Sequence, residues 1–297
     1  MKTAWVFPGQ GSQSLGMGAD LLNSPSAIAR FEQAEQILGW SVEVCLQEDR
    51  LSQTLYTHPC LYVVSAVLAD LMRERGDRPD LVAGHSLGEY VALYVAGVFS
   101  FEVGLQLVKR RAELMDRVST GVMMALIGVD HDQLMAQIEQ TPNVVLANDN
   151  HPGQVVISGL TDAIEAVLTK VKVRRVVPLK VSGAFHSPVV AEAAAAFCQV
   201  LDLVPFQSAQ IPVISNVEPT PQTKADVLKA QLRRQMTGSV RWREISLRLE
   251  IEGVDRVIEV GSGKVLTGLI SRTCDNLVLE NVESSKDLVE LAGSPRF

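Results

Sequence analysis

The stretch Gly84-His85-Ser86-Leu87-Gly88 decides the fold that we expect for this chain. It matches the G-x-S-x-G pattern, in which a serine lies on a tight turn between a strand and a helix. The flanking sequence fits, because residues 80–83 predict a short buried strand and residues 89–98 predict a helix without proline. Glycines beside the serine permit a strained backbone and a close approach of neighbouring elements. Ser86 is therefore the candidate nucleophile, and an incidental serine in a tight turn is the alternative.

The composition is typical of a globular protein. Of 297 residues, 47% are hydrophobic and 21% are charged, and this length suggests one or two domains. The formal net charge of −7 argues against general nucleic-acid binding. No apolar run approaches about 18 residues, and Pro8 comes too early for a signal peptide, so we expect no membrane partner and a cytoplasmic location. The scattered cysteines indicate reduced thiols: Cys45, Cys60, Cys198 and Cys274.

Strands and helices alternate along most of the chain, which predicts an α/β fold with a parallel sheet. A buried strand over residues 3–7 leads into a glycine-bearing loop, and the G-x-S-x-G strand and helix follow. Residues 122–181 show the order β-α-β-β-α-β, which is the ferredoxin-like arrangement. We therefore predict a large α/β-hydrolase-like domain with a nucleophile elbow, residues 1–120 and 183–297. A small ferredoxin-like α+β domain, residues 121–182, is inserted into it.

Three further expectations concern helix ends and the tail. A helix over residues 59–75 would carry Pro59 in its first turn. The turn Gly261-Ser262-Gly263-Lys264 precedes a helix and could bind phosphate at the helix N-terminus, although a plain strand-to-helix turn is favoured. The polar tail over residues 283–297 should be frayed.

The helix predicted over residues 101–118 contains one charged residue on its apolar side. At about 100° per residue, its polar residues form one continuous arc and its apolar residues form the complementary arc. Arg111 is the only charged residue within the apolar arc. A guanidinium that faces a protein interior is costly unless it is paired. Arg111 therefore predicts either a structural arginine, which extends its charged end to solvent or pairs with a carboxylate, or an anion site beneath the serine.

A nucleophilic serine needs a base within hydrogen-bond distance, and five histidines compete for this role. His85 should point away from the serine across the turn, His58 precedes a proline at a helix start, and His131 begins a surface helix. His151 lies in a loop and stays an alternative. His186 follows the last strand of the inserted domain, where the two domains meet and a cleft is expected. His186 is therefore the favoured base.

The residues do not reveal an acid that would orient this histidine. Between the serine turn and His186, no aspartate or glutamate lies in a clear strand-end loop of the large domain. A carboxylate is not strictly required, because any acceptor that holds Nδ1–H fixes the tautomer. A neutral acceptor stabilises the imidazolium less.

Four motifs occur together and in order: Phe7-Pro8-Gly9-Gln10-Gly11-Ser12-Gln13, Gly84-His85-Ser86-Leu87-Gly88-Glu89-Tyr90, Gly183-Ala184-Phe185-His186-Ser187 and Glu259-Val260-Gly261-Ser262-Gly263-Lys264. In these motifs the chain resembles the malonyl-CoA:acyl carrier protein transacylases over about residues 3–273. The resemblance implies ping-pong transfer of a malonyl group from coenzyme A to Ser86. The group then passes to the phosphopantetheine thiol of acyl carrier protein. No bound cofactor and no metal are implied, since the coenzyme A thioester is a substrate.

The resemblance also implies roles for individual residues. His186 would be the base, and the backbone carbonyl of Gln235 would orient it, which explains the missing acid. The backbone N–H groups of Gln10 and Leu87 would form the oxyanion hole. Arg111 would pair with the free carboxylate of the malonyl group, in agreement with the independent helix-arc argument.

Three details refine this interpretation. Phe185, before the base, resembles the malonyl-selecting rather than the methylmalonyl-selecting form of its motif. Ser262 departs from the family, which commonly has proline there, so this turn is expected to be less rigid. An acidic carrier needs a local basic surface on an enzyme that is itself negatively charged. We place that surface on or near the inserted domain: Lys170, Lys172, Arg174, Arg175 and Lys180.

We therefore predict a free-standing, monomeric malonyl transacylase of type II fatty-acid synthesis that binds malonyl-CoA and phosphopantetheinylated acyl carrier protein. A transacylase subunit of a polyketide synthase or of malonate decarboxylase would use the same chemistry with another carrier. A serine esterase would need a carboxylate to orient its histidine and would not need a buried Arg111. A non-catalytic carrier-binding scaffold would not need Ser86, His186 and Arg111 together.

Overall fold

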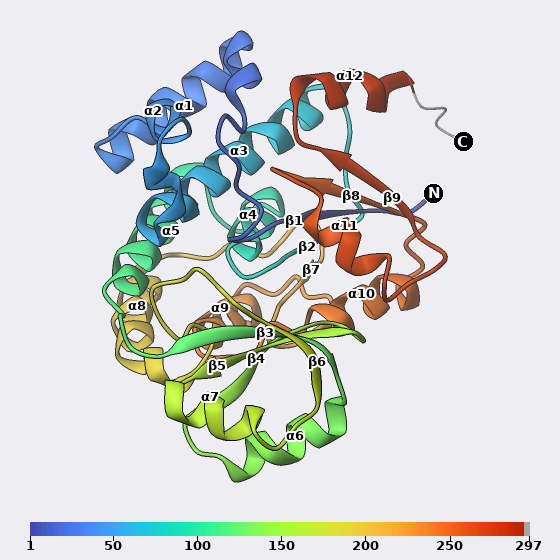
Figure 1. Ribbon diagram of the computed structural model, residues 1–297. Coiled ribbons are helices and arrows are strands. Elements are labelled where there is room, and N and C mark those ends of the chain that lie inside the picture. Colours follow the sequence, from blue (N-terminus) through green and yellow to red (C-terminus); the bar gives the residue numbers. More distant parts are fainter. Residues whose placement is uncertain (294–297) are drawn as a thin grey trace.

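The computed structural model describes residues 1–293, and in this range the strands form two separate sheets (Figure 1). The last residues of the predicted large domain and tail, 294–297, lie outside the described residues. One sheet has the order β7-β2-β1-β8-β9, and the other has the order β4-β5-β3-β6. The strands are β1 (Thr3–Phe7), β2 (Leu81–Gly84), β3 (Val122–Val129), β4 (Val144–His151), β5 (Gln154–Gly159), β6 (Val173–Pro178), β7 (Val213–Ile214), β8 (Arg256–Val260) and β9 (Val278–Val282).

The first sheet is parallel throughout, as the alternation of strands and helices predicted. β1 pairs with β2 from Ala4↔Leu81 to Phe7↔Gly84, and it pairs with β8 on its other side. Every residue of β1 and β2 is buried, because a parallel sheet is covered on both faces. Parallel strands end at the same edge, so the loops after β1, β2, β7 and β8 meet there. This edge carries the candidate site.

The second sheet is antiparallel and comes from the middle of the chain. Its elements follow the order β3-α6-β4-β5-α7-β6, which is the order expected from the sequence. Helices α6 (His131–Gln140) and α7 (Thr161–Leu168) pack on one face around Leu126, Leu134 and Ile164. In Figure 1 these helices lie on the side of the sheet that faces away from the parallel sheet. The opposite face joins the main core.

The remaining helices surround the parallel sheet (Figure 1). They are α1 (Pro25–Leu38), α2 (Val42–Cys45), α3 (Thr54–Glu74), α4 (Gly88–Val95), α5 (Phe101–Asp116), α8 (Ala191–Leu203), α9 (Ala225–Gln235), α10 (Trp242–Ile251), α11 (Val265–Ile270) and α12 (Ser285–Gly293), with 3₁₀ helices at η1 (Ala19–Asn23), η2 (Asp49–Ser52) and η3 (Pro188–Val190). The start of α5 is capped by Ser100, whose hydroxyl accepts the N–H of Val103. The cap satisfies one of the free backbone N–H groups at the start of α5, and Arg111 lies on the buried face of this helix.

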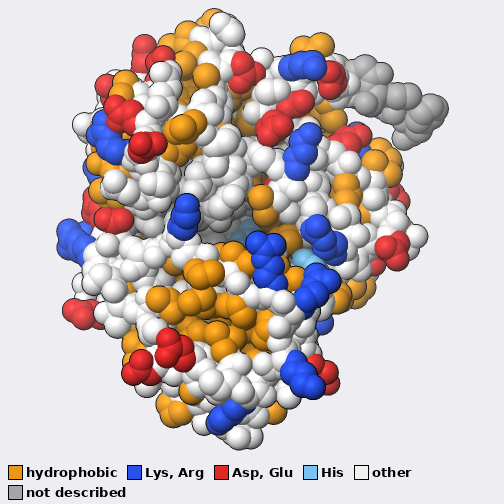
Figure 2. All heavy atoms as spheres, viewed as in Figure 1, with side chains coloured by type: hydrophobic (Ala, Val, Ile, Leu, Met, Phe, Trp, Pro, Cys, Tyr) orange, Lys and Arg blue, Asp and Glu red, His pale blue; other side chains and the backbone are white. Residues whose placement is uncertain are grey.

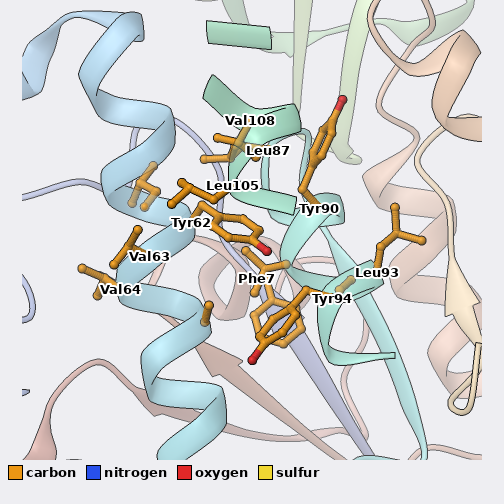
Figure 3. Close-up of a cluster of buried hydrophobic side chains, with 14 of the residues drawn as sticks. Phe7, Tyr62, Val63, Val64, Leu87, Tyr90, Leu93, Tyr94, Leu105 and Val108 are labelled. Carbon is orange, nitrogen blue, oxygen red and sulfur yellow. The ribbon is translucent and has the colours of Figure 1, made fainter. Parts of the chain in front are cut away.

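The apolar faces of α3, α4 and α5 meet the end of β1 in one core (Figure 3). Tyr62 from α3 lies close to Phe7 and to Leu105 of α5 in this view. Leu87, directly before α4, lies in the same cluster, whereas the ring of Tyr90 points away from Tyr62 in this view. All five side chains are buried. The serine turn therefore lies on a packed core with little freedom to shift.

Helix α3 differs from the expectation drawn from the sequence. It begins at Thr54, so Pro59 lies inside the helix and not in its first turn. A proline removes one backbone donor, and that cost is offset here because Thr54, Thr57 and His58 are buried against the core. The prediction that His58 is a helix-entry residue is therefore wrong, and its ring points inward.

The same helix is long and apolar enough to cross a membrane by length and composition alone. A helix of this length and hydrophobicity was not predicted from the sequence. Within the protein, 78% of its most apolar window is buried, because α3 packs against α4 and α5. It is a core helix here.

The C-terminal segment contains two elements that the sequence did not predict. β9 pairs with β8 at the edge of the parallel sheet, and α12 follows it. The prediction of a frayed tail is therefore wrong for residues 285–293. Side-chain oxygens explain the difference, since the Asp287 carboxylate accepts the N–H of Glu283 at 3.0 Å and the hydroxyl of Ser284 at 2.7 Å.

Candidate active site

Ser86 lies in the tight turn between β2 and α4 with a backbone φ of +50°. A left-handed φ is uncommon for residues other than glycine and is strained for serine. Neighbouring glycines make the turn possible, because a Cβ on Gly88 would lie 1.9 Å from the carbonyl oxygen of Phe7. The turn is also held by hydrogen bonds. The Ser86 N–H donates to Asn216 Oδ1 at 2.7 Å, and the Ser86 carbonyl accepts from Gln235 Nε2 at 2.7 Å.

His186 is the histidine that the fold brings to the serine. Its Nε2 lies 2.8 Å from Ser86 Oγ. Its Nδ1 lies 3.0 Å from the carbonyl of Gln235 and 3.1 Å from the carbonyl of Gly238. Carbonyl oxygens only accept, so Nδ1 carries the proton and Nε2 is free to accept one from the serine. Burial, and then the charge of Arg111, lower the pKa of His186 to about 3, so the ring is neutral.

The other three competing histidines outside α3 lie elsewhere. His85 points away from the serine, and its Nε2 lies 3.1 Å from Asn150 Oδ1. His151 Nδ1 accepts the N–H of Gly153 at 3.1 Å, within its own turn. His131 lies 3.9 Å from Asp149.

Arg111 is fully buried and also reaches the serine. Its Nη2 donates to Ser86 Oγ at 3.0 Å, and its Nη1 contacts His58 Nδ1 at 3.2 Å. The guanidinium lies over the ring of Tyr90, with 5.6 Å from Cζ to the ring centroid. Its Nε has no hydrogen-bond partner, and within residues 1–293 no carboxylate lies in ion-pair distance of it. Of the alternatives for this residue, the structural ion pair is therefore absent from the described part of the chain.

The backbone amides of Gln10 and Leu87 lie on two loops that touch. A Cβ on Gly9 would lie 2.4 Å from the carbonyl oxygen of His85, so the Gln10 loop packs directly against the serine turn. Neither amide has a hydrogen-bond partner among the residues that the structure describes. Two free N–H groups beside a serine can receive a negatively charged oxygen.

Two buried polar residues that the sequence analysis did not single out support the turn. Asn216 follows β7 and also donates from Nδ2 to the carbonyl of Gly84 at 2.6 Å. The Glu89 carboxylate accepts Gln235 Nε2 at 3.0 Å and the N–H of Asn216 at 3.2 Å. Burial raises the pKa of Glu89. These partners lie 127 to 146 positions apart in the chain, so no local pattern could have revealed them.

The glycine-rich turn of residues 261–264 does not leave the N-terminus of the following helix, α11, open to an anion. The carboxylate of Glu259 accepts the N–H groups of Leu266 and Thr267 at 3.0 and 2.8 Å, which occupies the start of α11. Ser262 Oγ donates to the carbonyl of Ser12 at 2.9 Å. The serine that replaces the family's usual proline therefore ties this turn to the Gln10 loop.

No group of three or more His, Cys, Asp or Glu side chains that could hold a metal ion occurs within the described residues. The chemistry that the site offers is that of a serine, a neutral histidine, a buried cation and two free amides. These are the components of acyl transfer to a serine.

Comparison with known proteins agrees with this geometry. The family model described as "Acyl transferase domain" matches residues 4–293. The malonyl CoA-acyl carrier protein transacylase of Synechocystis sp. is 55% identical over 293 residues, which cover 98% of this chain and 100% of the relative. A polyketide biosynthesis malonyl CoA-acyl carrier protein transacylase of Bacillus subtilis is 43% identical over 90% of this chain and 96% of its own length.

Solved structures agree as well. The crystal structure of the Synechocystis transacylase superimposes with a TM-score of 0.96 over 98% of this chain and 100% of that chain. A malonyl-transacylase in complex with a type II polyketide acyl-carrier protein superimposes with a TM-score of 0.93 at 35% identity, over 99% of this chain and 100% of that chain. These likenesses span nearly the whole molecule, both sheets included. The chain belongs to the acyl transferase family, among the malonyl-CoA:acyl carrier protein transacylases.

Proposed function

We propose that this chain transfers the malonyl group of malonyl-CoA to the phosphopantetheine thiol of an acyl carrier protein through a malonyl-Ser86 intermediate. One observation carries the proposal, namely the convergence of His186 Nε2 and Arg111 Nη2 on Ser86 Oγ, at 2.8 and 3.0 Å. A base and a buried cation that forms an ion pair with no carboxylate of the described residues meet at one hydroxyl, which suits an acyl group that bears a carboxylate. The names of the relatives support the same substrate pair.

In the first half-reaction, Ser86 Oγ attacks the thioester carbonyl carbon while His186 Nε2 takes the hydroxyl proton. The carbonyl oxygen becomes an oxyanion, which the free N–H groups of Gln10 and Leu87 would stabilise. When the carbon–sulfur bond breaks, His186 returns the proton to the sulfur of coenzyme A. The malonyl group then remains as an ester on Ser86.

In the second half-reaction, the thiol of the carrier attacks this ester. His186 takes the thiol proton and returns it to Ser86 Oγ as the carbon–oxygen bond breaks. The imidazolium that exists between these steps donates Nδ1–H to the carbonyls of Gln235 and Gly238. Two carbonyl dipoles would thus serve where other serine enzymes use a carboxylate.

Arg111 would select the acyl group. A planar guanidinium can hold a carboxylate with two hydrogen bonds, and burial from water strengthens that pair. On acylation Arg111 would exchange its contact with Ser86 Oγ for the malonyl carboxylate. Phe185 is buried beside the base, and we assign to it the malonyl rather than methylmalonyl preference that its motif implies.

We further propose a nucleophile elbow in an α/β-hydrolase-like domain formed by residues 1–120 and 183–297. The left-handed φ of Ser86 between β2 and α4 supports this assignment. Residues 121–182 would form the inserted ferredoxin-like domain, in keeping with the strand order β4-β5-β3-β6. The working enzyme would be a cytoplasmic monomer with no bound cofactor and no nucleic-acid or membrane partner.

The carrier would dock on basic residues of the inserted domain. Figure 2 shows Lys and Arg side chains around the hollow between the two parts of the molecule. The five basic residues predicted from the sequence are all exposed, but they do not share one face. Arg175 lies opposite Ile127 in the sheet and on the same side of β6 as Val177, which packs on the main core.

Because successive side chains of β6 point to opposite faces of the sheet, the five predicted basic residues do not form one surface. Arg175 lies on the face of β6 that turns toward the main core, whereas Arg174 points to the opposite face. Lys180 follows the end of β6, on the segment that leads back to the large part of the molecule. Lys170 and Lys172 lie in the turn between α7 and β6, at the far end of the strand. We therefore assign docking of an acidic carrier to Arg175 and Lys180, and the two lysines of the α7–β6 turn provide a matched control.

A polyketide carrier is the second candidate partner, because polyketide transacylases are among the relatives. Purified fatty-acid and polyketide carriers, compared at equal concentration, would decide between the two. A serine esterase is disfavoured, since Nδ1 of its histidine should face a carboxylate and here faces two backbone carbonyls.

The test is to incubate the protein with malonyl-, methylmalonyl- or acetyl-CoA without carrier and to locate the acyl group by mass spectrometry. We expect a malonyl ester on Ser86 that disappears on addition of carrier. Ser86→Ala should abolish it. A malonyl adduct that persists on another residue in Ser86→Ala would refute the assignment of the nucleophile.

A further inference from the structure

His58 is a buried histidine to which the steps above give no role. It lies on α3 and is 2% exposed, and its ring joins two parts of the site. Nδ1 lies 3.2 Å from Nη1 of Arg111, and Nε2 lies 2.9 Å from Oε1 of Gln10. One side chain thus spans the buried cation and the loop that carries a free backbone amide.

The donors and acceptors around this ring fix its tautomer. A guanidinium only donates, so His58 Nδ1 must accept and carries no proton. Nε2 then carries the ring proton and donates to Gln10 Oε1. The Gln10 side chain in turn donates from Nε2 to Thr54 Oγ1 at 3.3 Å. The hydrogen bonds therefore run in one direction, from Arg111 through His58 and Gln10 to Thr54.

His58 is also held neutral. Burial, followed by the charge of Arg111, lowers its pKa well below the ordinary value. A proton on Nδ1 would place two donors against each other at 3.2 Å. The neutral ring is therefore a fixed acceptor for the guanidinium.

We infer that His58 is a positioning residue that holds the guanidinium of Arg111 in place and ties it to the Gln10 loop. Arg111 has no carboxylate partner within residues 1–293, so His58 and Ser86 make the side-chain hydrogen bonds that orient it. Without His58, Nη1 would be left buried and unsatisfied. The inference rests on the proposed function for the identity of the substrate.

Two substitutions separate this role from simple packing. His58→Leu keeps an apolar group of similar size but has no acceptor for Arg111. His58→Gln keeps a donor and an acceptor in one planar amide, at about the spacing of the two ring nitrogens. Loss of a buried hydrogen-bond partner costs about 5- to 150-fold when converted to a rate. We expect His58→Leu to lower the malonyl-to-acetyl ratio of kcat/KM by that order, and His58→Gln to restore most of it.

A double variant tests whether His58 acts through the arginine. In an Arg111→Ala background, His58→Leu should cause no further fall in the malonyl-to-acetyl ratio, because the group that His58 positions is gone. An unchanged ratio in folded His58→Leu would overturn the inference. So would a further fall in the double variant, or failure of His58→Gln to recover.

A measurement on the native protein covers the case in which His58→Leu does not fold. With ¹⁵N-labelled imidazoles, NMR should find His58 neutral, with its proton on Nε2. The opposite tautomer or an imidazolium at neutral pH would overturn the inference. The proposed function fails separately, if malonyl-CoA leaves no ester on Ser86. If Ser86 is acylated normally and His58→Leu keeps its selectivity, only the role of His58 is lost.

Discussion

Replacing Arg111 by alanine should remove malonyl transfer and spare acetyl transfer. Arg111 is fully buried, its Nη2 contacts Ser86 Oγ at 3.0 Å, and no carboxylate of the described residues pairs with it. Its charge is therefore available to an incoming carboxylate. An acetyl group offers no such carboxylate, so its transfer does not depend on the guanidinium. The ratio of the two activities isolates this one interaction.

The expected loss of malonyl transfer can be estimated because Arg111 and the malonyl carboxylate would form a buried charge pair. Truncating one partner of a buried charge pair costs roughly 2–5 kcal/mol, which is about 30- to 5,000-fold in kcat/KM at about 1.36 kcal/mol per tenfold change. Arg111→Ala should lose malonyl transfer by that order. Arg111→Lys should recover only part, because an ammonium is a point charge and cannot reproduce the planar fork of a guanidinium.

The same variant should change the pH dependence of acetyl transfer. His186 must be neutral to accept the serine proton, so activity is lost as the pH falls through its pKa. Burial and then Arg111 lower that pKa to about 3. Removal of the arginine leaves the effect of burial but removes the repulsion between the two cations. The pKa of His186 should therefore rise, and the acid limb of the profile should move to higher pH in Arg111→Ala but less in Arg111→Lys.

The assay is single-turnover acylation of Ser86 by malonyl-CoA and acetyl-CoA, followed by mass spectrometry over a range of pH. Circular dichroism and thermal unfolding establish that each variant is folded. If both acyl donors react more slowly by the same factor in folded Arg111→Ala, the arginine is structural. The substrate assignment then loses its main physical support.

Two further predictions concern the base and the carrier. His186→Ala should slow acylation of Ser86 by about 10²- to 10⁴-fold, whereas His151→Ala should change little, because that ring bonds within its own turn; the reverse pattern would mean that the base is misassigned. Charge reversal at both Arg175 and Lys180 should raise the KM for the carrier and leave the coenzyme A half-reaction unchanged, whereas reversal of the two lysines of the α7–β6 turn should have a smaller effect. Equal damage to both half-reactions would argue against docking there.

Features that depend on neighbouring residues could be predicted from the sequence. The burial of Arg111 followed from helix periodicity, because residues on one face of a helix recur at a fixed spacing. The strand of residues 3–7 matches β1, and the strand-serine-helix order around Ser86 matches β2 and α4. The β-α-β-β-α-β order of the segment that forms the antiparallel sheet was also predicted from the sequence.

Features that depend on distant residues could not be predicted. His58 was mistaken for a helix-entry residue because proline usually marks a first turn, and burial of the preceding residues overrode that preference. Glu89 stands in the serine motif, but its partners are Asn216, which follows β7, and Gln235 of α9, far along the chain. Strand β9 is short and only partly buried, so it carries a weak pattern. In each case the decisive contact joins segments that only the fold brings together.

Two reacting residues of the site, Ser86 and His186, have a strained backbone conformation. Within the described residues, the left-handed φ values outside glycine occur at Ser86, Asn143 and His186. Asparagine tolerates that conformation, but for serine and histidine it raises the free energy of the folded state by roughly 1–3 kcal/mol each. Glycine would relieve the strain but would remove the reacting side chain, so at these two positions the reaction requires the strained residue. Hydrogen bonds from Asn216 and Gln235 hold the serine turn, and two carbonyls hold the histidine ring. The strained turn at Ser86 is thus held by hydrogen bonds to its own backbone, and in that conformation Ser86 Oγ lies 2.8 Å from His186 Nε2.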